Sequence, residues 1–249
     1  MKLNRSSARV ALSSAVFAIA LFGLPGVAKS DRTAAAAPPA ELPAATAETI
    51  SAFDAAGWQN VGVGDIDPKL FGMALDVAAA AVQRGDAPAP GTLTVIDFSR
   101  PSTVKRMWVY DLRSRKLLFE EVVSHGRGSG RTLATSFSND PESYQSSLGL
   151  YRTAETYVGK HGYSLRLDGL EAGINDRARE RAIVMHGADY VDPRAAQAQG
   201  YLGRSLGCPA LRPQVTRQLI EAVKDGGLLF AYYPDPEWLA TSKYVSVAP

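Results

Sequence analysis

From Gly91 onward the chain is a series of short apolar runs separated by turn residues, and this pattern restricts the fold more than any other feature. Runs of this length that are rich in valine, leucine and aromatic residues are typical of β-strands. One helix is clear, starting at Pro213 and ending before Gly226. The pattern predicts a mainly β fold with a few helices over residues 91–236. The expected strands are Leu93–Phe98, Met107–Asp111, Lys116–Val123, Ser164–Leu167, Ala182–His186 and Leu228–Tyr233.

The first thirty residues have the three parts of a secretory signal. A basic start precedes an apolar run from Val10 to Leu24, and small residues near Ser30 suit cleavage. We therefore expect export across the inner membrane, to the periplasm or the cell wall. Removal of residues 1–30 deletes four basic side chains and changes the formal net charge from +2 to −2. The basic composition therefore does not indicate binding to nucleic acid.

Composition divides the remaining chain into four segments. Residues 31–48 are rich in alanine and proline, which predicts a flexible linker. Residues 49–90 are expected to form a short helical segment, because Asp67-Pro68 supplies an N-cap and a first helical position before an apolar face. Residues 91–236 make the β-rich domain, and residues 237–249 form a tail without a strong signal.

The chain has one cysteine, Cys208, and three histidines, at positions 125, 161 and 186. A single cysteine in an exported protein cannot form an internal disulfide, so it is buried, pairs with another chain, or is used chemically. These four residues are widely separated and include no closely spaced pair of zinc ligands. We therefore expect no metal site.

His186 and Cys208 are the pair from which thiol chemistry could be built. A free thiol has a pKa of about 8.5 and needs a base to become a nucleophile at neutral pH. His186 ends an apolar run, and the following Gly187 leaves its ring accessible. Cys208 follows Ser205 and Gly207 in a turn whose backbone N–H groups can bind an oxyanion. The alternative is an inert cysteine that is buried or forms a dimer.

Two further stretches are rich in residues that suit binding sites. Residues 125–131 contain several glycines and predict a tight loop, because the lysine and hydroxyl residue of a phosphate-binding loop are missing. His161 is either close to the site or on the surface. Tyrosines with interleaved glycines form either a binding surface for a polar ligand or half-buried strand positions, and they lie at 144, 151, 157 and 163.

The order of these motifs resembles that of the L,D-transpeptidases, which are secreted cysteine enzymes of the peptidoglycan layer. The resemblance is closest to their murein L,D-transpeptidase catalytic-domain branch and covers roughly residues 91–234. It depends on H-G at His186-Gly187 and on G-R-S-L-G-C-P-A-L at residues 203–211. The supporting stretches are S-H-G-R-G-S-G at 124–130, F-S-N at 137–139, S-S-L-G-L-Y at 146–151 and G-K-H-G-Y-S-L-R-L-D-G-L-E at 159–171.

The resemblance implies a β-sandwich-like catalytic fold in which Cys208 is the nucleophile and His186 is its base. It also implies that Ser205 supports the turn and that the Gly207–Cys208 backbone is a candidate oxyanion site. One residue departs from the family pattern, because Leu206 stands where the commonest form of the motif has a histidine.

The function of that missing histidine would then fall to the backbone, to His161 or to His125. Arg204 either binds a substrate carboxylate or holds the loop, and the first is favoured. The further candidates for substrate binding are Gly187, His161 and Tyr151.

The implied reaction is acyl transfer on the tetrapeptide stems of peptidoglycan. Cys208 would attack the carbonyl of the third stem residue and release D-alanine. The acyl group would then pass to an amine on a neighbouring stem or on an anchored protein. Transfer to water would instead make the protein an L,D-carboxypeptidase, and a non-catalytic wall-binding module is the alternative from a different class. Nothing in the sequence specifies an oligomeric state.

Overall fold

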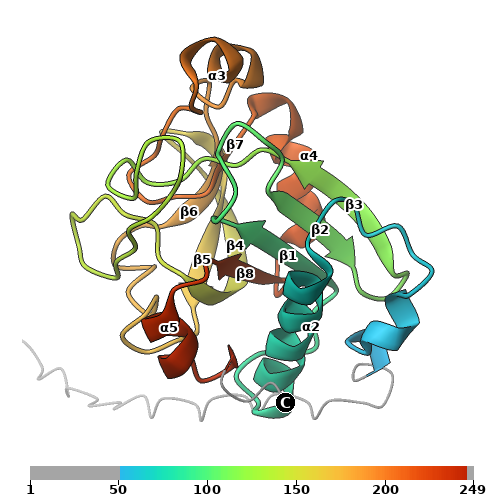
Figure 1. Ribbon diagram of the computed structural model, residues 1–249. Helices are drawn as coiled ribbons and strands as arrows, with labels where there is room; N and C mark the ends of the chain where they lie inside the picture. The colour runs from blue at the N-terminus through green and yellow to red at the C-terminus, as the bar shows by residue number, and fades with distance from the viewer. Residues whose placement is uncertain (1–50, 246–249) are drawn as a thin grey trace, which may run out of the picture. The chain divides into compact units, whose positions relative to one another are not determined.

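The computed structural model describes residues 51–245, so the expected signal (residues 1–30) and the expected linker (residues 31–48) lie outside the described residues. In this part of the chain all strands join one sheet of eight, in the order β3-β2-β1-β8-β4-β5-β6-β7 (Figure 1). They are β1 (Thr92–Asp97), β2 (Met107–Asp111), β3 (Lys116–Glu121), β4 (Gly149–Gly159), β5 (Gly162–Gly169), β6 (Val184–Gly187), β7 (Ala210–Leu211) and β8 (Leu228–Tyr232).

The mainly β fold with a few helices is confirmed, and each expected strand is present. The helices expected after Asp67 and at Pro213 are also confirmed, whereas β4, β7 and two short helices were not predicted. No helix within residues 51–245 is both long and apolar enough to cross a membrane. The helical elements are η1 (Ala55–Trp58), α2 (Pro68–Gln83), α3 (Pro193–Gln199), α4 (Pro213–Val223) and α5 (Pro236–Thr241).

The centre of the sheet is covered on both faces. Every residue of β1 is buried, and only the last residue of β2 and of β8 is partly exposed. Figure 1 shows α2 in front of the sheet at β1 and β2, and α4 behind it. Helices on both faces remove both sides of these strands from water, which explains why β2 and β8 are apolar nearly throughout instead of alternating.

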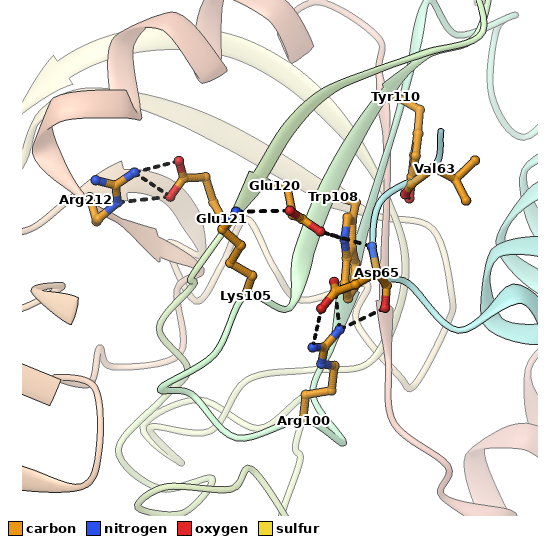
Figure 2. Close-up of polar contacts among 9 residues, drawn as sticks. All are labelled: Val63, Asp65, Arg100, Lys105, Trp108, Tyr110, Glu120, Glu121 and Arg212. Atoms are coloured by element: carbon orange, nitrogen blue, oxygen red, sulfur yellow. Dashed lines mark hydrogen bonds and ion pairs between the residues drawn. The ribbon is translucent and has the colours of Figure 1, made fainter. Parts of the chain in front are cut away.

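The segment before α2 is fastened to β2 and β3 by a polar cluster (Figure 2). The Tyr110 hydroxyl donates to the Val63 carbonyl at 2.7 Å. Glu120 accepts from the Asp65 N–H at 3.1 Å and from the Trp108 indole at 3.0 Å. The Asp65 carboxylate also pairs with Arg100 at 2.8 Å, which lowers its pKa. These contacts attach the chain before α2 to the edge of the sheet that lies away from β6 and β7.

Candidate active site

Strand β6 carries His186 between two neighbours that determine its surroundings. His186 pairs with Ser164 of β5 on one side and with Ala210 of β7 on the other. Continuing the parallel register of β6 and β7 brings Cys208 opposite Val184, two residues before His186. The contacts agree, because Cys208 Sγ accepts from the Val184 N–H at 3.4 Å and lies 3.7 Å from the carbonyl of Ala182. The sulfur therefore lies beside the strand that carries the histidine.

The turn before Cys208 is held by the hydroxyl group of Ser205, which lies within the turn, and by contacts from neighbouring loops. The Ser205 hydroxyl donates to the Cys208 carbonyl at 2.6 Å and accepts from the Gly207 N–H at 3.1 Å. Ser146 donates from its hydroxyl to the Gly207 carbonyl at 3.0 Å. The Ser205 N–H donates to the carbonyl of His125 at 2.9 Å. Ser205, which is predicted to support the turn, makes two of these contacts through its hydroxyl group.

These contacts determine which of the two expected oxyanion donors, the N–H groups of Gly207 and Cys208, is free. The Gly207 N–H is already bound to Ser205, so it is not directed at a substrate. Within residues 51–245, the Cys208 N–H donates to no other residue and lies against its own thiol. Of the two backbone N–H groups expected to bind an oxyanion, the one of Cys208 is therefore available.

His186 is held as a neutral ring with a defined tautomer. Its Nδ1 lies 2.9 Å from the carbonyl of Gly187, and because a carbonyl can only accept, Nδ1 carries the proton. Nε2 is then free to accept one. Burial lowers the pKa of His186, and the nearby charges of His161 and Lys160 act in the same direction. A ring that stays neutral below pH 7 can act as a general base.

The thiol of Cys208 is protonated in the free site. Burial raises its pKa, and the Val184 N–H together with the charges of Arg181 and Lys160 reduces this rise. A thiol that has a neutral imidazole as its base gives up its proton as it attacks, instead of existing as a stable thiolate.

A family model described as the L,D-transpeptidase catalytic domain matches residues 63–232 of the chain. The chain belongs to this family. The resemblance seen in the sequence is therefore confirmed. Both members of the pair, His186 and Cys208, lie within the matched residues. A comparison with curated protein sequences finds no significant match.

Solved structures of L,D-transpeptidases show a weaker similarity to this chain. An enzyme from Mycobacterium smegmatis is 15% identical with a TM-score of 0.35, over 58% of this chain and 59% of that one. An enzyme from Stackebrandtia nassauensis is 14% identical with a TM-score of 0.35, over 76% and 91%. A helical cell shape determining protein from Campylobacter jejuni is 11% identical with a TM-score of 0.39, over 58% and 48%. The assignment to the family depends on the family model alone.

The three histidines of this L,D-transpeptidase domain have different surroundings. His161, in the turn between β4 and β5, stacks on His186 with ring centroids 4.3 Å apart. His125 is fully buried and accepts from Arg106 through Nδ1 at 2.8 Å. Leu206 is 53% exposed at the tip of the cysteine turn. Of the two histidines considered as substitutes at the Leu206 position, His161 is therefore the one beside the site.

The remaining candidates for substrate binding separate in the structure. Tyr151 is buried and donates to the Ser147 carbonyl at 3.0 Å, so the idea that it contacts substrate is wrong. Arg204 donates to the carbonyl of Gly130 at 2.9 Å. This contact fits the alternative in which Arg204 holds the loop instead of binding a substrate carboxylate. Gly187 lines a cavity next to His186.

The tyrosines at 144, 157 and 163 do not form one surface with Tyr151. Each instead stacks with a different arginine, namely Arg127, Arg166 and Arg217.

Sequence reasoning missed three residues whose charge or burial is linked to the thiol. Arg181 donates to the carbonyls of Ser138 and Gln145 at 2.7 and 2.6 Å, and its charge lowers the pKa of Cys208. The charge of Lys160 does the same, and burial raises the pKa of Tyr190 with a further contribution from Cys208. No periodicity singles out these residues, because the folding of distant loops brings them to the cysteine.

Replacing Gly207 by alanine is expected to destabilise the fold and to slow reaction of the thiol. Gly207 has a φ of +129°, and an added Cβ would lie 2.8 Å from both the Gln145 carbonyl oxygen and an Ile183 methyl group. A strained backbone of this kind costs about 1–3 kcal/mol. Urea unfolding and alkylation of Cys208 would measure the two effects.

Gly173→Ala is the matched control, since Gly173 has a φ of +77° with nothing within 4 Å of the added Cβ. Equal losses in both variants would contradict a specific role of the close contacts at Gly207.

Proposed function

We propose that this chain is an exported peptidoglycan L,D-transpeptidase with Cys208 as nucleophile and His186 as general base. The observation that carries the proposal is the position of the Cys208 sulfur, 3.4 Å from the Val184 N–H on the strand that holds His186. Membership of the L,D-transpeptidase catalytic-domain family supports the reaction class. The secretory pattern of the first thirty residues supports a substrate outside the cytoplasm.

In the first step the Cys208 sulfur attacks the carbonyl of the third residue of a tetrapeptide stem. His186 Nε2 takes the thiol proton, and the Cys208 N–H donates to the oxygen that becomes negative. The protonated ring then gives its proton to the leaving amine, so D-alanine departs and a thioester remains. The hydrogen bond from Nδ1 to the Gly187 carbonyl keeps the ring in one tautomer throughout.

In the second step an amine attacks the thioester carbon. His186 removes a proton from the attacking nitrogen and returns it to the sulfur as the C–S bond breaks. The product is a new amide and a free thiol, so one active site runs both half-reactions with the same base. Neither half-reaction uses a metal or an organic cofactor.

The proposal is tested first by labelling and then by product analysis. The mature protein incubated with a carbapenem is expected to gain the mass of one adduct, and Cys208→Ala is expected to gain none. Incubation with a disaccharide that carries a tetrapeptide stem is then expected to give cross-linked dimers. Tripeptide without dimers would instead establish an L,D-carboxypeptidase.

A thiol that reacts neither with the carbapenem nor with small alkylating reagents would refute catalysis by Cys208. A non-catalytic wall-binding module would then be the remaining alternative for the function of this chain. Circular dichroism of both proteins controls for loss of the fold.

A further inference from the structure

The guanidinium of Arg181 holds a neighbouring loop against the cysteine turn. Within residues 51–245 its four hydrogen-bond acceptors are two carbonyls and two hydroxyl groups of residues 138–147, namely Ser138 at 2.7 Å, Gln145 at 2.6 Å, Ser147 at 2.6 Å and Ser143 at 3.2 Å. The same loop donates from Ser146 to the carbonyl of Gly207. An added Cβ at Gly207 would lie 3.4 Å from Arg181 Nη2, so the guanidinium is also next to the residue before Cys208.

The positive charge of Arg181 is not matched by a carboxylate in contact with it. Arg181 is half-buried, and in the part of the chain that the structure describes it makes no ion pair. Asp140 acts on it electrostatically, but the Asp140 side chain is 82% exposed and pairs with Arg177 at 3.8 Å. Burial lowers the pKa of Arg181, yet an arginine keeps its proton at physiological pH. An anion that forms beside such a cation is stabilised by it.

The group that becomes negative beside Arg181 is the thiol of Cys208. Burial raises the pKa of this thiol, and the Val184 N–H and the charge of Arg181 reduce the rise. The effect is mutual, since the charge of Cys208 opposes the burial that lowers the pKa of Arg181. Leu206, which stands where the commonest form of the family motif has a histidine, has no charge with which to do the same.

We propose that Arg181 is a positioning residue whose fixed positive charge stabilises the negative charge that forms on the Cys208 sulfur during attack. This inference deepens the proposed function and rests on it. The thiol proton passes to His186 Nε2, and the electron pair that remains on sulfur forms the bond to the substrate carbon. Arg181 neither gives nor takes a proton. Because its charge is in place before the reaction starts, no reorganisation is needed when the sulfur becomes negative.

Replacing Arg181 by glutamine tests the role of the charge. Alkylation of the single thiol by iodoacetamide is measured by mass spectrometry as a function of pH, a reaction that requires the thiolate but no substrate. The pKa of the thiol is expected to rise by about one unit, so the rate at pH 7 should fall about tenfold. The other titratable groups around the thiol stay in place, namely His186, Lys160, Tyr151 and Tyr190.

Carbapenem acylation provides a second readout. Its maximal rate in Arg181→Gln is expected to fall by a similar factor, whereas the carbapenem concentration that gives half of this rate should not change. Arg181→Lys keeps the charge and is expected to restore most of both reactions.

Two further variants separate the charge from the hydrogen bonds. Ser143→Ala/Ser147→Ala removes two of the four acceptors of Arg181 and leaves its charge, so the thiol should keep the pKa that it has in the unmodified protein. Arg179→Gln is the matched control for the loss of one positive charge. Arg179 is two residues away and pairs with Glu155 and Asp168, so its removal should not affect the thiol.

An unchanged thiol pKa in folded Arg181→Gln would overturn the proposal, as would an equal rise in the serine double variant. Circular dichroism establishes that each variant is folded. If Arg181→Gln does not fold, the two variants that keep a cation decide. An unchanged thiol pKa in both Arg181→Lys and Ser143→Ala/Ser147→Ala supports the role of the charge, and a rise of about one unit in either overturns it.

Failure of the proposed function gives a different result. The unmodified protein would then form no carbapenem adduct and no tripeptide, whatever the alkylation profiles show. The profiles would still decide whether the charge of Arg181 acts on the thiol, because iodoacetamide needs no substrate site.

Discussion

Replacing His186 by alanine is expected to slow acylation of Cys208 by about 10²–10⁴-fold, the usual contribution of a general base. The thiol of Cys208 has a raised pKa and therefore keeps its proton until a base removes it. His186 is on the strand that the sulfur touches, and its Nδ1–H is bound to Gly187, which leaves Nε2 for this proton. Stopped-flow measurement of carbapenem acylation would give the rate.

The pH dependence of the same reaction provides a second measurement. Because burial lowers the pKa of His186, the acidic limb of the rate profile is expected below about pH 6.5, the ordinary histidine value. This limb should disappear in His186→Ala. His161→Ala is the matched control, since it removes the stacked neighbour and leaves the base in place. An unchanged acylation rate in His186→Ala would assign the activating group elsewhere.

Lowering the pH from 7 to 4 is expected to remove about 3 kcal/mol of stability through His125 alone. Burial and the charge of Arg106 lower the pKa of this histidine from about 6.5 to about 3. Its Nδ1 faces the Arg106 guanidinium at 2.8 Å, so a proton on this nitrogen would point at another donor. Between pH 6.5 and pH 3, His125 is therefore neutral in the folded protein and protonated in the unfolded chain. Its contribution to the free energy of unfolding is fully present above pH 6.5 and decreases as the pH falls toward 3.

Urea unfolding at pH 7 and pH 4 measures this difference. His125→Gln should flatten the change, because glutamine keeps an oxygen for Arg106 and has no titrating nitrogen. The remaining slope comes from carboxylates and from His186, whose pKa is also lowered. The exposed His161 provides the control His161→Gln, which leaves the contact between His125 and Arg106 in place. A His125→Gln variant with an unchanged slope would contradict the assignment.

The strands of the central sheet could be predicted from sequence because their apolar residues are nearly continuous. Strand β4 was missed, since polar residues interrupt its pattern and its register to β5 shifts between Thr153 and Thr156. The helices α3 and α5 were also missed, although each begins with the Asp-Pro pair that revealed α2. Both are too short to show an apolar face, so the cap was their only local signal.

The candidate site was predictable only where residue type and motif carry the information. The single cysteine and the H-G pair are the features from which Cys208 and His186 are predicted. Arg181 and Lys160 could not be found in this way, because arginine and lysine are common on any surface and only the fold brings these two to the thiol. Tyr151 was predicted to bind substrate because a tyrosine in a polar stretch is usually exposed. In the structure its ring is buried beneath the cysteine turn.

The order of the strands has a consequence for how the chain reaches its folded state. Strand β8 lies between β1 and β4, and its parallel partner β1 is more than a hundred residues earlier in the sequence. Until Leu228–Tyr232 has been synthesised, β1 and β4 each present an open edge, and the two parts of the sheet have nothing to join them. Such distant pairing is slow, and open edges invite pairing with other chains. A chain truncated before β8 is therefore expected to aggregate, even though every residue of the cysteine turn is already present.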